Sequence, residues 1–335
     1  MMETLEGVEL CFPQLLNTSC RKSMRPRSEA VLFYVLLSFI SLLTVTLNLL
    51  VIISISHFRQ LHTPTNLILL SLAVSDFLVG LLVMPGEGAG HIGICWVLGD
   101  FMCALSYLGL FIIISASVGN MVLISIDRYV AICDPLNYTT KITQKRVQIS
   151  ICVSWIWSVF YNIMILSNYL MQSHKFNSCY GDCVLIINYI AGAADFLLTC
   201  VFPITVIVVL YLRVFLVVVY QARAMRSQVR TVTGWYRVSV TANKSERKAA
   251  KTLGIVIAVF LLCFCPYYYQ SLSGQDTENN ALSVTFVIWL LYFNSCLNPV
   301  IYVFFYPCFK KAIKLITTLQ ILQPGSCEAN LLQTE

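Results

Sequence analysis

Seven long apolar stretches run through this 335-residue chain and restrict its fold more than any other feature. A helix needs about 20 predominantly apolar residues to cross the hydrocarbon core of a bilayer, and each stretch is long enough. The stretches contain only two charged side chains, Asp76 and Asp195, and each needs a functional or pairing role at bilayer depth. The sequence predicts an all-α membrane protein, a bundle of seven transmembrane helices. The expected spans are 30–56, 66–85, 101–126, 147–170, 184–212, 252–274 and 281–306.

The basic residues indicate how the bundle is oriented. With the N-terminus outside, 17 of the 22 Lys and Arg residues lie on the cytoplasmic side, in line with the positive-inside rule. We therefore expect a multi-pass plasma-membrane protein with an extracellular N-terminus and the lipid bilayer around it. The net charge of +6 reflects this topology. Nucleic-acid binding is not expected, because the basic residues are divided among short loops at one membrane face.

The chain divides into three regions around this bundle. Residues 1–29 form an extracellular N-terminus with a glycosylation motif at Asn17, residues 30–306 form the transmembrane domain, and residues 307–335 form a cytoplasmic segment. Within that segment, 308–319 places apolar residues on one face and lysines on the other. This pattern predicts a short amphipathic eighth helix on the inner leaflet, with an ordinary solvated helix as the alternative. Palmitoylation of Cys327 stays open.

Six cysteines lie on the predicted outer side, where disulfides persist. Six cysteines allow 15 pairings, so the sequence alone does not settle how they are joined. The six are Cys11, Cys20, Cys95, Cys103, Cys179 and Cys183.

Short motifs occur at fixed places within the spans. They are Asn48 in the first span, Asp76 in the second, Asp127-Arg128-Tyr129 at the end of the third, Trp155 in the fourth, Cys263-Phe264-Cys265-Pro266 in the sixth and Asn298-Pro299-Val300-Ile301-Tyr302 in the seventh. Each motif alone is a weak signal. In this order, over most of the chain, the set resembles the rhodopsin-like (class A) G-protein-coupled receptors, which fold as a seven-helix bundle.

The run from Asn294 to Phe309 carries a closer resemblance, to the trace amine-associated receptors, and in particular to fish-type olfactory members that lack the third-span Asp. Cys308 departs from the pattern, because that family usually has Trp there. The resemblance implies a chemosensory, olfactory receptor for amines that acts through a heterotrimeric G protein of the stimulatory type and raises cAMP. A class A receptor for a peptide or lipid is the alternative, and the particular amine, mono- or diamine, stays open.

Two other function classes fit the sequence less well. A retinal-type pump needs a Schiff-base lysine in its last span, and residues 281–306 contain none. A membrane enzyme needs a metal-ligand cluster or a nucleophile–base pair, and the spans contain neither. We therefore expect a receptor and not an enzyme.

The resemblance also implies two pairings among the outer cysteines. The second of these pairings would tie the N-terminus over the ligand pocket. The expected pairs are Cys103–Cys183 and Cys20–Cys179, with Cys11 and Cys95 left unassigned.

Asp195 is the expected partner of the amine. Amine receptors of this family usually hold the ammonium with an Asp 18 residues before the Arg of the Asp-Arg-Tyr motif, and that position is Leu110 here. Eighteen residues make five helical turns, so Leu110 and Arg128 share the side that faces the bundle. Asp195, in the outer half of the fifth span, supplies a carboxylate across the pocket instead. The alternative is a neutral Asp195 that is bonded to a backbone or hydroxyl group.

Apolar and aromatic residues complete the expected pocket. Rings near a desolvated ammonium add roughly 0.5–2 kcal/mol each, although aromatic stripes more often pack the core. Glu87, near the outer end of the second span, is a second acidic candidate, either for the second ammonium of a diamine or as a solvated residue. The other expected lining residues are Ile113, Ile114, Thr199, Phe264, Tyr267, Tyr268, Ile288 and Tyr292.

Arg128 is the centre of the expected activation switch. It faces the bundle at the cytoplasmic edge, within reach of Asp127 beside it and Glu246 at the foot of the sixth span. Such a pair would tether two helices in a resting state; the alternative is that both carboxylates solvate helix ends. Tyr211 and Tyr302 are expected to hold Arg128 in the open state. The remaining switch residues are Phe260, Asn298 and Pro299.

Asp76 is expected to lie within a polar cluster. The family fold brings oxygen-bearing side chains around it, and a carboxylate with neutral oxygen ligands suits a small hard cation. The resemblance therefore implies an allosteric Na⁺, with a protonated, hydrogen-bonded Asp76 as the alternative. No other cofactor is expected. The oxygen-bearing side chains are those of Ser117, Asn294, Ser295 and Asn298.

Overall fold

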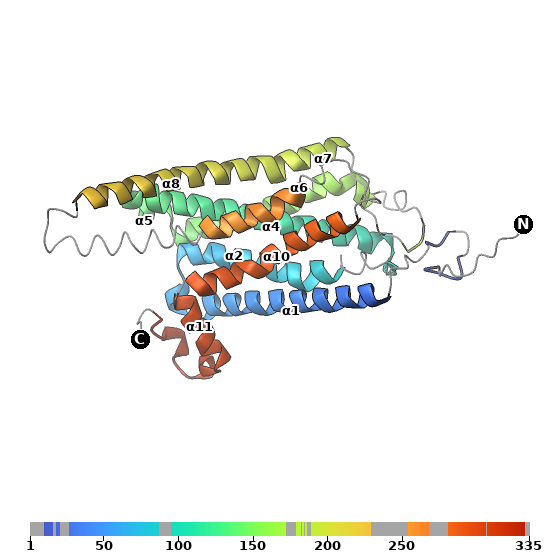
Figure 1. The fold of residues 1–335 in the computed structure, drawn as a ribbon, viewed down its shortest axis with the longest axis horizontal. Coiled ribbons are helices and arrows are strands. Elements are labelled where there is room, and N and C mark those ends of the chain that lie inside the picture. The colour runs from blue at the N-terminus through green and yellow to red at the C-terminus, as the bar shows by residue number, and fades with distance from the viewer. Residues whose placement is uncertain are drawn as a thin grey trace, which may run out of the picture.

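The computed structural model describes most of the chain, and nearly all of the described part is helical (Figure 1). Long helices lie side by side along one direction, and a short helix near the C-terminus turns away from them. The described residues are 10–15, 18–20, 27–86, 95–171, 179–181, 183, 185, 189–228, 254–267, 281–305 and 307–331. The predicted sites Asn17, Glu87, Glu246 and Tyr268 lie outside them.

The described helices occupy the positions of the predicted spans. Five are long and apolar enough to cross a membrane, and two shorter apolar helices, Gly254–Tyr267 and Phe286–Ile301, stand where the sixth and seventh spans were expected. The predicted fold class is thereby confirmed. The main helices are α1 (Arg27–His57), α2 (Pro64–Leu78), α4 (Gly99–Cys133), α6 (Gln144–Met171), α7 (Tyr189–Asp195), α8 (Phe202–Gln228), α10 (Ala281–Phe305) and α11 (Pro307–Thr317).

Among the described residues, two stretches of π-helix interrupt the second and the fifth span. Val79–Val83 (η2) follows α2, and Phe196–Val201 (η5) joins α7 to α8. The fifth span is therefore one continuous helix made of an α-helical, a π-helical and a second α-helical segment. The start of α2 is of the ordinary kind: Pro64 stands in its first turn, and the Thr63 hydroxyl caps it by accepting from the Asn66 amide at 3.2 Å. Single π-helical turns are often found at functional sites, which makes η5, directly after Asp195, of particular interest.

Helices α4 and α6 pack closely in the middle of the bundle. A Cβ atom added to Gly119 would lie 2.2 Å from the Ser154 hydroxyl oxygen, so the two backbones approach each other at this glycine. On the same α6, Asn162 is fully buried, and its amide donates to the Ser115 hydroxyl at 3.0 Å. The rotation of α6 about its axis is therefore fixed against α4.

Gly119→Leu is expected to destabilise the receptor by about 1–3 kcal/mol, the usual cost of overpacking a filled core. An alanine needs only a new rotamer of Ser154, whereas a leucine must separate α4 from α6. The melting temperature of the purified receptor measures the effect. Gly109→Leu is the matched control, because nothing lies within 4 Å of a Cβ at Gly109. Equal melting temperatures for the two variants would contradict the close approach.

The C-terminal segment folds back against the first cytoplasmic turn. Helix α11 buries Phe309 and Ala312, which are 2% and 0% exposed, as an amphipathic helix should. Beyond it, the Glu328 carboxylate accepts from Arg59 at 3.0 Å, and the Leu331 amide donates to the Gln60 side chain at 2.8 Å. This return could not be predicted from residue types, because it depends on contacts between residues about 270 positions apart.

Candidate functional site

The outer end of the bundle carries three disulfides among the described residues. Two are the predicted pairs, Cys103–Cys183 and Cys20–Cys179, with Cα–Cα distances of 5.7 and 5.0 Å. The third joins the two cysteines that the sequence left unassigned. It is Cys11–Cys95, with a Cα–Cα distance of 5.4 Å.

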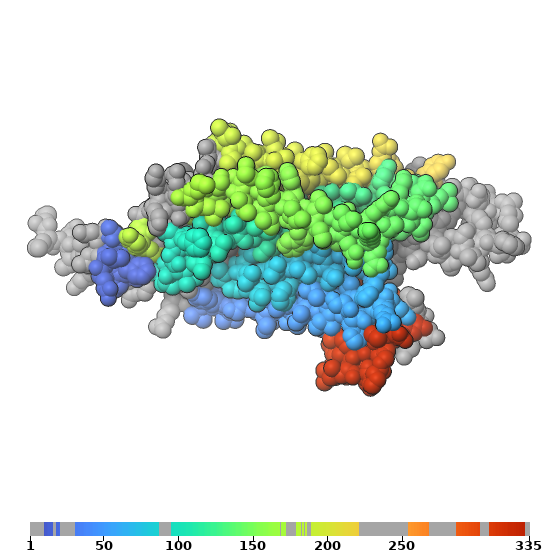
Figure 2. Space-filling model, turned by 180° about the vertical axis from the view of Figure 1, so that it is seen from behind, coloured from blue at the N-terminus to red at the C-terminus, as the bar shows by residue number. Residues whose placement is uncertain are grey.

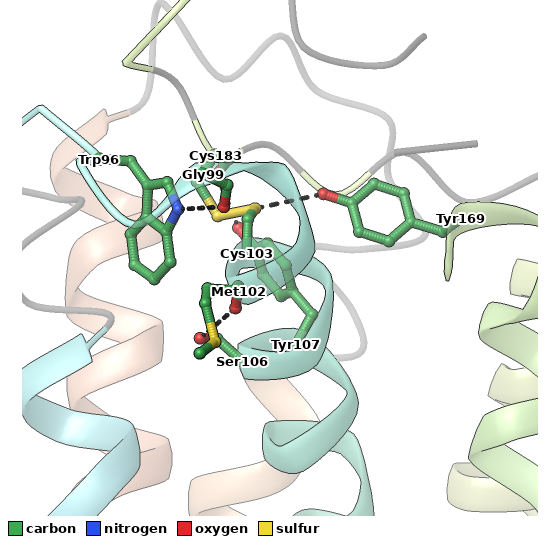
Figure 3. The surroundings of a disulfide bond; sticks show 8 residues. All are labelled: Trp96, Gly99, Met102, Cys103, Ser106, Tyr107, Tyr169 and Cys183. Atoms are coloured by element: carbon green, nitrogen blue, oxygen red, sulfur yellow. Dashed lines mark hydrogen bonds between the residues drawn. A yellow bond between two sulfur atoms is a disulfide. The ribbon is translucent and has the colours of Figure 1, made fainter. Parts of the chain in front are cut away.

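The Cys103–Cys183 bridge is surrounded by hydrogen-bonded aromatic residues (Figure 3). The Tyr169 hydroxyl lies 3.4 Å from the Cys103 sulfur, and the Tyr107 hydroxyl donates to the Cys183 carbonyl at 3.1 Å. The Trp96 indole donates to the Gly99 carbonyl, at the start of α4, at 2.8 Å. The start of the third span is thereby fixed to both flanking loops.

The N-terminal segment is held against the same loops by backbone hydrogen bonds. The Tyr180 amide donates to the Thr18 carbonyl at 2.7 Å, and the Trp96 amide donates to the Gly181 carbonyl at 2.9 Å. Gly181 has φ +104°, and a Cβ there would lie 2.8 Å from the Cys11 Cβ, so only glycine fits. We call this cross-linked unit, residues 10–15, 18–20, 95–98, 179–181 and 183, the outer cap.

Removing the third bridge, with Cys11→Ser and Cys95→Ser together, is expected to loosen the outer cap. A disulfide typically contributes about 2–4 kcal/mol, mainly by restricting the unfolded chain. The double variant should therefore melt at a lower temperature than the parent. Cys152→Ser, which replaces an exposed free cysteine of α6, is the matched control. Peptide mapping without reduction that recovered Cys11 as a free thiol from the parent protein would contradict the bridge.

A cavity lies in the outer half of the bundle, between the second, third, sixth and seventh spans. It brings together four of the predicted ligand residues and two of the residues expected around Asp76, and all of its lining side chains are uncharged. The lining residues are Val79, Val83, Leu110, Ile114, Ser117, Phe264, Leu291, Tyr292 and Ser295. Predicted residues Ile113 and Ile288 pack in the apolar cluster beside Leu110 and Tyr292.

Asp195 is not among the residues that line this cavity. Its Oδ1 accepts a hydrogen bond from the Tyr161 hydroxyl of α6 at 3.0 Å. The Thr199 hydroxyl, one turn later, donates to the Asp195 backbone carbonyl at 2.7 Å. The sequence left open that Asp195 is bonded to a hydroxyl group, and the structure shows such a partner in Tyr161. Tyr161 was not identified from the sequence, although a tyrosine in an apolar span needs a partner for its hydroxyl.

Asp76 is fully buried and lies against the seventh span. The Asn298 amide donates to its Oδ2 at 2.8 Å. Within the described part of the chain, Oδ1 of Asp76, Asn294 and Asn298 has no hydrogen-bond partner. Ser117 and Ser295 are 3% and 4% exposed and line the cavity above. The cluster therefore offers several buried oxygen atoms to a further group.

Arg128 lies at the cytoplasmic end of the third span and is engaged by its neighbours. Its Nε donates to Asp127 Oδ2 at 2.9 Å, and a second nitrogen donates to the same oxygen. Asp127 also accepts from the hydroxyls of Thr65 at 3.0 Å and Tyr138 at 2.9 Å. These two hydroxyls link the third span to the start of the second span and to the second cytoplasmic loop. Neither was identified from the sequence.

The other predicted switch residues lie on the helices behind this network. Phe260 is 1% exposed, and its ring centroid lies 4.2 Å from that of Phe264. Tyr211 faces the sixth span, where its ring lies 3.3 Å from a Cβ position at Gly254. Pro299 is inside α10. Tyr302 is in the same helix, but its side chain lies outside the described part, and Tyr267 packs at the edge of the core cluster.

Comparisons with known proteins match this architecture. Residues 47–302 match the family model described as 7 transmembrane receptor (rhodopsin family). The chain is 36% identical over 334 residues to Trace amine-associated receptor 13c of Danio rerio, which covers 96% of each protein. It is 38% identical over 337 residues to Trace amine-associated receptor 7e of Mus musculus, covering 97% of this chain and 92% of the relative. It is 37% identical over 328 residues to Trace amine-associated receptor 5 of Rattus norvegicus, covering 96% and 95%.

Proposed function

The chain belongs to the rhodopsin family of seven-transmembrane receptors, and from this premise we propose that it is a chemosensory receptor for amines. Proteins of this family are multi-pass membrane receptors that work with a ligand and a G protein, and they are not enzymes. The assignment of an amine as the ligand rests on one observation. The chain is 36–38% identical, over nearly its whole length, to proteins named trace amine-associated receptors.

The amine binds, in this proposal, through its ammonium group to the Asp195 carboxylate. Two carboxylates lie within the predicted spans, and the other, Asp76, is fully buried against Asn298. Asp195 lies in the outer half of its span, next to the π-helical segment η5. Leu110, at the position where family members usually carry the amine-binding Asp, lines an uncharged cavity that suits an apolar part of the ligand.

Signalling is proposed to run through a stimulatory G protein to cAMP, in the membrane of olfactory neurons. The similarity to trace amine-associated receptors supports this assignment. An extracellular N-terminus is supported by the outer cap, because its three disulfides belong to an oxidising compartment. The Asp127–Arg128 network lies at the opposite end of the third span, at the face that would meet the G protein.

A sodium ion is proposed as an allosteric ligand of the Asp76 cluster. Na⁺ prefers oxygen ligands, and the unpartnered Oδ1 atoms of Asp76, Asn294 and Asn298 together with the hydroxyls of Ser117 and Ser295 fit that preference. A bound cation would offset the cost of a buried carboxylate charge. The ion would supply charge compensation within the cluster and no chemistry.

A ligand panel tests the proposed function. Cells that express the receptor are exposed to primary monoamines, diamines, peptides and lipids, and cAMP is measured with and without the stimulatory Gα subunit. We expect a response to at least one amine that is lost without that subunit. A response to peptides or lipids alone would overturn the amine assignment, and an amine response that persists without the subunit would overturn the coupling.

A further inference from the structure

We propose that Tyr161 is a positioning residue for amine recognition, which holds the Asp195 carboxylate in the orientation that meets the ammonium. This inference rests on the proposed function, because it presumes that Asp195 meets an amine. It adds the fourth span to the recognition site. The bond from the Tyr161 hydroxyl to Asp195 Oδ1 is 3.0 Å long and joins residues 34 positions apart.

The position of Tyr161 on α6 is fixed by the contacts between α6 and α4. The next residue, Asn162, is fully buried, and its amide bonds to the Ser115 hydroxyl of α4 at 3.0 Å. Gly119, one turn after Ser115 on α4, and Ser154, two turns before Asn162 on α6, keep the same two helices in close contact. Because α6 cannot rotate freely against α4, the Tyr161 hydroxyl reaches toward the fifth span from a fixed position.

The hydrogen bond is also shielded on its bilayer side. Tyr161 is 8% exposed, whereas Trp157, one turn earlier on α6, is 59% exposed on the surface of the bundle. The two rings stack with centroids 6.1 Å apart and an interplanar angle of 18°. Figure 2 shows α6 and the fifth-span helix running next to each other on this face of the molecule. A hydrogen bond kept away from water is stronger than an exposed one.

The consequence for the ligand follows from the geometry of a carboxylate. An aspartate carboxylate has two oxygens, and a fixed donor on Oδ1 orients Oδ2, which we assign to the ammonium N–H. The Thr199 hydroxyl bonds to the Asp195 backbone at 2.7 Å and steadies the turn from which this side chain projects. The Thr199 side chain is a second hydrogen-bond partner of the carboxylate. Loss of the Tyr161 hydroxyl would therefore leave the carboxylate less ordered before the ligand arrives, which lowers affinity.

Tyr161→Phe tests the inference, because it keeps the ring and its stacking on Trp157 and removes only the hydroxyl. Hydrogen bonds to charged groups are among the stronger ones, so we expect the half-maximal amine concentration to rise about tenfold to a hundredfold. Surface expression, basal cAMP and the melting temperature of the purified receptor are measured in parallel. Tyr169→Phe is the matched control, because it removes a buried hydroxyl from the same helix that lies at the Cys103 sulfur instead of at Asp195.

The outcomes separate this inference from the proposed function. A potency loss in Tyr161→Phe at unchanged melting temperature, with Tyr169→Phe within threefold of the parent, supports the positioning role. Full potency in Tyr161→Phe, while Asp195→Asn loses the amine response, overturns the inference and leaves the proposed function standing. A potency loss that is matched by a fall in melting temperature overturns it as well, since it assigns Tyr161 to stability. An unaffected Asp195→Asn receptor overturns both.

Discussion

Asp195→Asn is expected to raise the amine concentration for half-maximal response by about a hundred- to several-thousand-fold. Removing one partner of a buried, hydrogen-bonded ion pair costs about 3–5 kcal/mol, and each 1.4 kcal/mol is about tenfold in affinity. Asparagine keeps the shape of the side chain and can still accept from Tyr161, so the variant isolates the charge. Amine dose–response curves read by cAMP, at matched surface expression, measure the effect.

Two further variants complete this experiment. Asp100→Asn is the matched control, because it removes a carboxylate at the outer start of α4 that we do not place at the amine, and it should stay within about threefold of the parent. Leu110→Asp should change the order of preference among amines, because it adds a carboxylate on the wall of the cavity. An Asp195→Asn receptor that answers the same amine at the same concentration would remove Asp195 from the site.

The seven-helix bundle could be predicted from the sequence because the bilayer imposes it. Each span must form all of its backbone hydrogen bonds within the helix, across a hydrocarbon core of fixed thickness. The length of an apolar stretch is therefore enough to identify a span. An apolar stretch shows which residues lie within the hydrocarbon core, but it does not show at which residue the helix ends. For this reason the predicted end of the fifth span, at 212, falls short of Gln228, where α8 ends. Backbone hydrogen bonding continues beyond the apolar window into a segment that carries Arg213, Arg223 and Arg226.

The sequence predicted individual residues of the candidate site but not the contacts between them. Asp195 stood out because a lone carboxylate in an apolar span is costly. Its partner did not, because the contact with Tyr161 depends on how α6 is rotated and on a π-helical segment, η5, that residue types do not reveal. The Cys11–Cys95 bridge was hidden for a related reason. The bridge joins residues 84 positions apart, and the loop backbone at Gly181 lies against Cys11, a tertiary contact that residue types do not reveal.

The polar residues around Arg128 were likewise visible only in part. The charge pair with Asp127 follows from adjacency in the sequence, and the structure places both side chains together, 10% and 1% exposed. Thr65 and Tyr138 come from segments on either side of the third span. Burial and the neighbouring Asp127 charge raise the pKa of the Tyr138 hydroxyl, so it stays protonated and keeps donating at neutral pH.

Asp127→Asn is therefore expected to raise basal signalling at least threefold at matched surface levels. The substitution removes the Asp127 charge from its ion pair with the largely buried Arg128 guanidinium, and breaking such a pair costs about 3–5 kcal/mol. Even 2 kcal/mol of that cost changes a two-state equilibrium about thirtyfold. Basal cAMP without added amine measures the shift. Tyr138→Phe removes one neutral donor to Asp127 and should give a smaller rise in the same direction.

Asp134→Asn separates the loss of this buried network from the loss of a carboxylate at the cytoplasmic face. Asp134 directly follows α4 and pairs with Lys141 at 2.7 Å, but the lysine side chain is 57% exposed. An exposed pair contributes little, so basal cAMP should stay at the parent level in this variant. If Asp127→Asn and Asp134→Asn gave the same basal cAMP, the charge on Asp127 would not be what holds Arg128 in the resting arrangement.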